Sequence, residues 1–84
     1  MDTNVQLRDE DAEKMVLGTI ILQRNAFEEV RELLSEESFY NPFHQEIYKA
    51  ILQVVSSGNR PDMITVKGKL VANGVKFELV EYMK

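Results

Sequence analysis

The chain has 84 residues, a formal net charge of −4, 44% hydrophobic residues and no cysteine. This composition is that of one small folded domain, and it excludes disulfides and thiolate metal sites. The acidic balance argues against a general nucleic-acid-binding module. The longest apolar run, residues 19–22, is far shorter than the roughly 20 residues of a membrane span. No signal-peptide pattern opens the sequence, so we expect a cytoplasmic protein.

Residues 1–8 show no periodicity, and we predict a flexible lead-in there. A first helix is predicted from Asp9, because acids fill its first turn and apolar residues follow at helical spacing. Gly18 lowers helix stability by roughly 1 kcal/mol relative to alanine, so we expect it to permit the close approach of another helix. Two apolar faces are predicted: Ala12, Met15, Val16, Thr19 and Ile20 on one, and Leu17 and Ile21 on the other.

A second helix is predicted to begin at Asn25, because Asn25 and Glu28 have the spacing of a capping box. Its apolar face would hold Phe27, Val30, Leu33 and Leu34. Residues 35–41 are predicted to form a loop that turns Phe39 and Tyr40 into the core.

Asn41 followed by Pro42 predicts the start of a third helix, with a capping side chain and then proline at the first helical position. Its wide apolar arc indicates that this helix is central. The arc consists of Phe43, Ile47, Ala50, Ile51 and Val54, with Tyr48, Leu52 and Val55 beside them.

Asp62 is predicted to cap a fourth helix, which Asn73 and Gly74 would end. Its core positions are Met63, Val66 and Leu70, with Val71 beside them. A fifth helix is predicted from about Phe77 and is still amphipathic at Lys84, so we expect the chain to be part of a longer protein. Strand alternation is absent, and the expected fold class is all-α, a small compact bundle of about five helices.

The search for catalytic motifs is mostly negative. The phosphate-binding pattern G-x-x-x-x-G-K-[ST] is absent, so we expect no ATP hydrolysis by this chain. His44 is the only histidine, and any metal site or nucleophilic triad would have to use it. We favour a structural His44, packed at a helix start and bonded to nearby backbone, over a general base or a partner-surface switch. Spacing fixes no partner acid, and a helix N-terminus disfavours the charged ring. We therefore expect no catalytic, cofactor-binding or metal-binding residue.

Three segments together resemble the N-terminal domain of DnaB-type replicative DNA helicases. Residues 11–22 are similar to the family's opening helix, with V-L-G and an apolar run. Residues 39–51 are similar to its F-Y, H and I-[FY]-x-A-[IM] pattern, and residues 61–66 to its D-x-x-T-[VL] helix start. Residues 75–81 lack the double glycine that usually follows, which indicates a divergent member. The structural signature comprises Gly18, Phe39, Asn41, His44, Ile47, Ile51, Asp62, Thr65 and Leu70.

The resemblance implies a non-catalytic head domain over residues 9–84, without the family's helical hairpin and ATPase domain. The parent would then be an ATP-dependent helicase, with ATP and Mg in its motor domain. The expected partners are further copies of the chain, in a dimer or a hexamer collar, and primase. Strong direct binding to nucleic acid or to a membrane is not expected. No motif marks the partner contacts, and exposure and charge alone suggest Glu29, Arg31, Lys67 and Lys69.

Other interpretations are a helicase-binding domain of a primase, a stand-alone helicase regulator with the same fold, and an independent small enzyme. The F-Y, H and I-Y-x-A-I run speaks against the primase domain. The lack of a convergent polar set in the sequence speaks against the enzyme. Strong salt-dependent binding to single-stranded DNA would favour a nucleic-acid-binding module instead.

Overall fold

A computed structural model describes residues 10–23, 25–76 and 78–83, apart from the side chains of Val80 and Glu81. The predicted lead-in at residues 1–8, together with Asp9 and Phe77, lies outside these residues. Every regular element in the described part is helical, which confirms the predicted all-α class. The elements are α1 (Glu10–Leu22), α2 (Ala26–Val30), the 3-10 helix η1 (Glu36–Ser38), α3 (Pro42–Ser56), α4 (Met63–Ala72) and α5 (Leu79–Tyr82).

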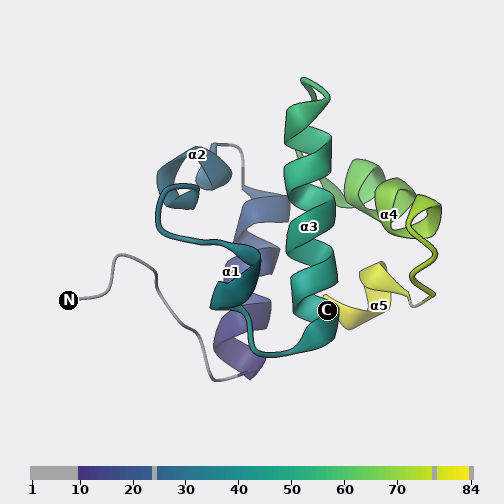
Figure 1. The fold of residues 1–84 in the computed structure, drawn as a ribbon, viewed down its shortest axis with the longest axis horizontal. Coiled ribbons are helices and arrows are strands. Elements are labelled where there is room, and N and C mark those ends of the chain that lie inside the picture. The colour runs from purple at the N-terminus through teal and green to yellow at the C-terminus, as the bar shows by residue number, and fades with distance from the viewer. Residues whose placement is uncertain (1–9, 24, 77, 84) are drawn as a thin grey trace.

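Helix α3 is the centre of the bundle, as its wide apolar arc predicts. Figure 1 shows α1 and α2 on one side of α3 and α4 and α5 on the other. Helix α3 contacts α1, η1 and α4, and α1 also reaches α4. None of the helices in the described ranges is long and apolar enough to cross a membrane.

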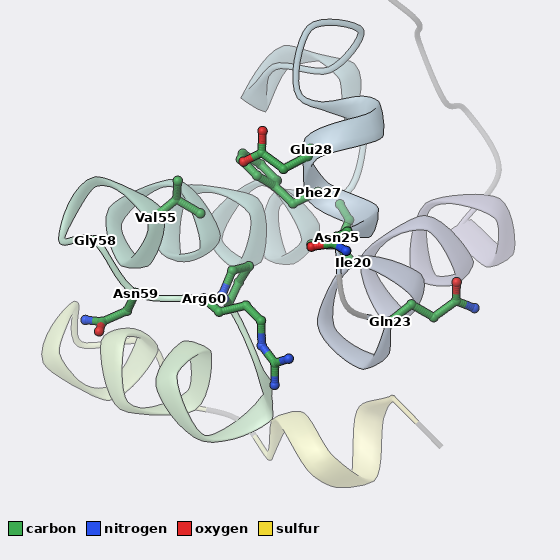
Figure 2. Close-up of a pocket in the computed structure, with 10 residues that line it drawn as sticks. Ile20, Gln23, Asn25, Phe27, Glu28, Val55, Gly58, Asn59 and Arg60 are labelled. Atoms are coloured by element: carbon green, nitrogen blue, oxygen red, sulfur yellow. The ribbon is translucent and has the colours of Figure 1, made fainter.

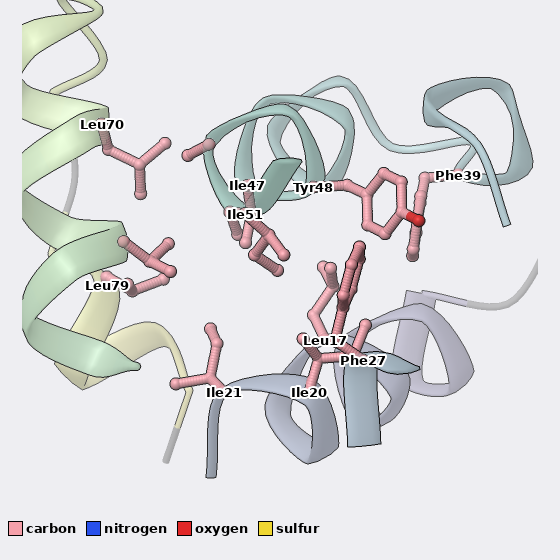
Figure 3. Packing of buried hydrophobic residues seen from close by; sticks show 12 residues of the cluster. Leu17, Ile20, Ile21, Phe27, Phe39, Ile47, Tyr48, Ile51, Leu70 and Leu79 are labelled. Carbon is pink, nitrogen blue, oxygen red and sulfur yellow. The ribbon is translucent and has the colours of Figure 1, made fainter. Parts of the chain in front are cut away.

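The apolar core contains side chains from all five α-helices, together with Phe39, which follows η1. Figure 3 shows the side chains of α3 between those of α1 and α4. The Tyr48 ring lies 5.2 Å from the Phe39 ring and 6.3 Å from the Phe27 ring, between centroids. Tilted aromatic pairs at such distances add to the stabilisation from burial. The core includes Leu17, Ile20, Ile21, Phe27, Phe39, Ile47, Tyr48, Ile51, Val66, Leu70 and Leu79.

The buried face of α1 differs from the two predicted faces. It consists of Glu13, Leu17, Ile20 and Ile21, whereas Met15 is 72% exposed. Successive helical residues are about 100° apart, so Met15 lies about 200° from Glu13. Once Glu13 faces inward, Met15 must face solvent.

Several other residues with predicted core positions are exposed. Phe39 is 1% exposed, but Tyr40 is 76% exposed, because neighbouring side chains in extended backbone point to opposite sides. Phe43 is 53% exposed, since α3 turns its neighbour His44 inward, and Val71 on α4 is 67% exposed.

Two of the three predicted helix caps are confirmed. The Asn41 side chain accepts from the backbone N–H of Phe43 at 2.8 Å. Asp62 and Thr65 form a reciprocal capping box, in which each side chain accepts from the other's backbone N–H. These bonds satisfy donors that a helix N-terminus otherwise leaves without partners.

The predicted capping box at Asn25 is wrong. Asn25 has a φ of 70°, in the left-handed region, and its side chain does not cap α2. Helix α2 ends at Val30, so the predicted apolar face also breaks: Leu34 packs against the core, but Leu33 is 48% exposed.

The predicted close helix approach at Gly18 is also wrong within this chain. A Cβ added at Gly18 would meet no atom within 4 Å among the described residues. Gly18 is half-buried at the side of α1, because Leu17 and Ile20 take the inward positions.

Candidate functional site

A buried polar cluster joins three helices that are distant in sequence. His44 from α3 lies between Glu13 from α1 and Tyr82 from α5. Its Nδ1 is 2.6 Å from Glu13 Oε1, and its Nε2 is 2.5 Å from the Tyr82 hydroxyl. Glu13 and His44 are 0% exposed. Buried polar groups at such distances link the helices directly.

The Glu13 carboxylate receives two further donors from the loop before α3. The backbone N–H of Tyr40 donates at 2.6 Å and that of Asn41 at 3.2 Å. Burial by itself raises the pKa of Glu13. The hydrogen bonds from Tyr40, His44 and Asn41 outweigh it, so the pKa lies below its ordinary value. The buried carboxylate is therefore ionised at neutral pH.

The tautomer of His44 follows from its partners. An ionised carboxylate only accepts, so Nδ1–H donates to Glu13, and in the neutral ring Nε2 accepts from the Tyr82 hydroxyl. Burial, followed by the charges of Glu10, Glu13 and Asp11, raises the pKa of Tyr82, so this hydroxyl keeps its proton. Both ring nitrogens are occupied within the fold, and neither is available to a substrate.

The environment of His44 corrects part of the sequence interpretation. His44 is buried at a helix start, as the structural interpretation predicts, but its partners are side chains and not nearby backbone. The partner acid lies 31 residues earlier in the chain. A sequence signal for it exists: Glu13 shares the i, i+4, i+7 face of Leu17 and Ile20. An acid on an apolar helix face calls for a buried partner.

The four residues suggested for partner contacts lie in two separate places. Glu29 and Arg31 belong to the α2 region, and Lys67 and Lys69 belong to α4. Figure 1 places α2 and α4 on opposite sides of α3, so these residues do not share one surface. Arg31 bonds Glu28 at 3.1 Å, and Lys69 is only partly exposed. Their role in binding stays a prediction.

A pocket of about 320 Å³ opens on the α2 side of the molecule. It lies where the end of α1, the start of α2 and the loop after α3 meet, and Figure 2 shows its lining residues around the opening. Ile20 and Phe27 belong to its apolar lining, and Asn59 and Arg60 to its polar rim. Within the described ranges, no group of three or more histidine, aspartate or glutamate side chains is placed to hold a metal ion.

Fold and cluster together define a small all-helical domain, held by an apolar core and one closed hydrogen-bond network. The family described as DnaB-like helicase N terminal domain matches residues 5–84, and the chain belongs to this family. The match confirms the resemblance drawn from residues 11–22, 39–51 and 61–66.

Curated relatives support the assignment. The chain is 38% identical over 68 residues to the replicative DNA helicase DnaB of Mycobacterium leprae. The matched stretch covers 81% of this chain and 11% of that protein. It is 36% identical over 81 residues to DnaB of Rickettsia conorii, covering 96% of this chain and 15% of that protein. With DnaB of Geobacillus stearothermophilus it shares 38% over 63 residues, 75% of this chain and 14% of that protein. The chain thus spans only a small part of these relatives. No solved structure showed a significant match to the chain.

Proposed function

We propose that this chain acts as the non-catalytic N-terminal domain of a replicative DNA helicase, where it supports assembly of the hexamer collar and docks primase. The observation that carries the proposal is the family match over residues 5–84, together with relatives named as replicative helicases. ATP and Mg would be bound by the motor domain of the parent protein.

The outer surface of the bundle suits protein contacts. Met15 and Leu22 on α1 are 72% and 70% exposed, and Ile64 and Val71 on α4 are 83% and 67% exposed. In each pair the two residues are seven apart, so they share one face of their helix. Large apolar side chains that gather on a surface are a mark of interaction sites.

The test measures binding of this chain to the primase from the same genome by isothermal titration. A saturable complex is expected. If the α2 side carries the contact, the double variant Glu29→Ala with Arg31→Ala should weaken the complex. If the α4 side carries it, the double variant Lys67→Ala with Lys69→Ala should do so. No complex with primase, together with no entry of the chain into helicase collars by light scattering, would refute the proposal. Tight, salt-dependent binding to single-stranded DNA would point to a nucleic-acid-binding module.

A further inference from the structure

The pocket beside α2 has a buried apolar floor. Ile20 is 2% exposed and Phe27 is 5% exposed, and Pro61 is also buried. The volume of about 320 Å³ lies at the lower end of the range of ligand pockets, about 300–1,000 Å³. A site of this size and lining takes an apolar side chain and not a whole helix.

The rim of the pocket carries three primary amides, from Gln23, Asn25 and Asn59. Each amide offers both a donor and an acceptor, which is what the backbone of an extended peptide needs. Figure 2 shows the Asn25 amide turned toward the opening, whereas Gln23 and Asn59 point outward on opposite sides of it. The left-handed φ of 70° at Asn25 is uncommon for a residue other than glycine, and such conformations concentrate at functional sites.

The pocket lining carries one acid, Glu28, and one base, Arg60. Glu28 is neutralised by Arg31, whose guanidinium bonds both carboxylate oxygens at 3.1 and 3.2 Å. Arg60 is exposed on the other side of the opening (Figure 2). Asp62 binds the backbone N–H of Thr65 at 2.8 Å, and no ion pair joins Arg60 to a carboxylate of the described residues. The pKa of Asp62 is lowered chiefly by the Thr65 N–H and also by the nearby charge of Arg60. The exposed guanidinium of Arg60 still has room for a carboxylate from outside, because it forms no ion pair within the described residues.

We infer that this pocket binds a short extended segment of a partner protein in which an apolar side chain is followed by aspartate or glutamate. The apolar side chain would lie on Ile20 and Phe27, the Asn25 amide would bind the peptide backbone, and Arg60 would bind the carboxylate. The inference rests on the proposed function as a docking domain and specifies the chemistry that one of its surfaces recognises.

The test uses fluorescence polarisation with a positional library of fluorescein-labelled hexapeptides whose C-termini are amidated. Selection of an apolar residue followed by an acid is expected. Amidation ensures that the acid is a side chain and not a terminal carboxylate. Arg60→Ala should weaken the selected peptides about 1.5-fold to fivefold, the range of an exposed ion pair at a rim. The matched control is Lys49→Ala, an exposed cation on α3 outside the pocket, which should leave binding unchanged.

A charge exchange sharpens the test. Arg60→Glu should bind poorly to the selected peptides and recover when their acid is replaced by lysine. No selection, selection of basic residues, or equal effects of the Arg60 and Lys49 changes would overturn the inference. If primase binds the chain and Arg60→Glu leaves that affinity unchanged, the pocket is not the docking site and the proposed function stands. If primase does not bind the chain while the peptides do, the proposed function fails and the inference about the pocket stands.

Discussion

Glu13 connects α1 to the loop before α3 and, through His44, to α3 and α5. Its carboxylate holds the loop before α3 through Tyr40 and Asn41, and reaches α5 through His44 and Tyr82. Desolvating a carboxylate is unfavourable, and the donors around Glu13 offset that cost only while all of them are in place. The cluster is therefore sensitive to the loss of one partner.

Replacing Glu13 with glutamine should destabilise the domain by about 2–4 kcal/mol. The amide keeps one acceptor oxygen and turns an NH₂ group toward donors, which leaves buried N–H groups without partners. Urea denaturation followed by circular dichroism measures the change in free energy of unfolding. The matched control is Glu29→Gln, an exposed acid on α2, which should shift stability by less than about 0.5 kcal/mol. Equal effects of the two changes would show that the cluster contributes nothing.

Acid should destabilise the wild-type domain more than Glu13→Gln. The pKa of Glu13 in the folded state lies below its ordinary value of about 4.5. Its contribution to stability is therefore complete above that value and is lost as the pH falls through the folded-state pKa. The pKa of Asp62 is lowered too, chiefly by the Thr65 N–H, but Asp62 is present in both proteins. Parallel stability curves from about pH 7 to about pH 3 would contradict the assignment.

Among the elements, the caps of α3 and α4 are built from side chains, whereas the start of α2 is built from backbone conformation. Asp62→Ala should lower the free energy of unfolding by about 1 kcal/mol, because the N–H of Thr65 loses its acceptor. Asn25→Gly should be neutral or stabilising by up to about 1 kcal/mol, because glycine adopts a φ of 70° without strain. Thermal unfolding of both variants measures the contrast. A loss at Asn25 as large as that at Asp62 would mean that the Asn25 side chain supports α2.

Helix α5 is four residues long, and a helix this short is not stable without tertiary contacts. Its contacts include the buried Leu79, the Tyr82–His44 hydrogen bond and the Tyr82 ring, which packs against the core and lies under the Lys14 ammonium. Tyr82→Phe should release α5 while the rest of the bundle stays folded. Hydrogen exchange at the amide of Met83, which donates to Leu79 at 2.9 Å, should become faster. The exposed Tyr40→Phe is the control, and unchanged exchange in Tyr82→Phe would show that the hydrogen bond to His44 does not hold α5.

For the whole molecule, the side of α1 is unfilled at Gly18. Gly18→Ala should raise the free energy of unfolding of the isolated chain by about 0.5–1 kcal/mol, because alanine is the better helix former and meets no atom there. Thermal unfolding measures this gain. A loss of stability would mean that another chain covers Gly18 in solution, which sedimentation of the wild type would reveal as a dimer.

The sequence determined the helical class, the central place of α3 and the caps at Asn41 and Asp62. These features depend on local spacing and on residues a few positions apart, so the pattern of the chain contains them. The sequence also identified the family, because three of its segments match the family's pattern in the same order and at similar separations. The sequence did not place Met15 or Phe43 outside the core, since a helix with apolar residues on several sides leaves its rotation open. It did not place Tyr40 outside either, because a loop of unknown path leaves open which of two neighbouring aromatic residues turns inward.

Only the tertiary structure decided which face of each helix is buried and which groups meet. Glu13 and His44 are 31 residues apart and Tyr82 is 38 residues beyond His44, so no local pattern pairs them. The pocket beside α2 likewise joins Asn25 to Arg60 across the packing of three segments. Local propensity fixes where a helix begins and ends. The rotation of α1 that turns Glu13 inward follows from the buried hydrogen bonds that the carboxylate must find once the helices pack.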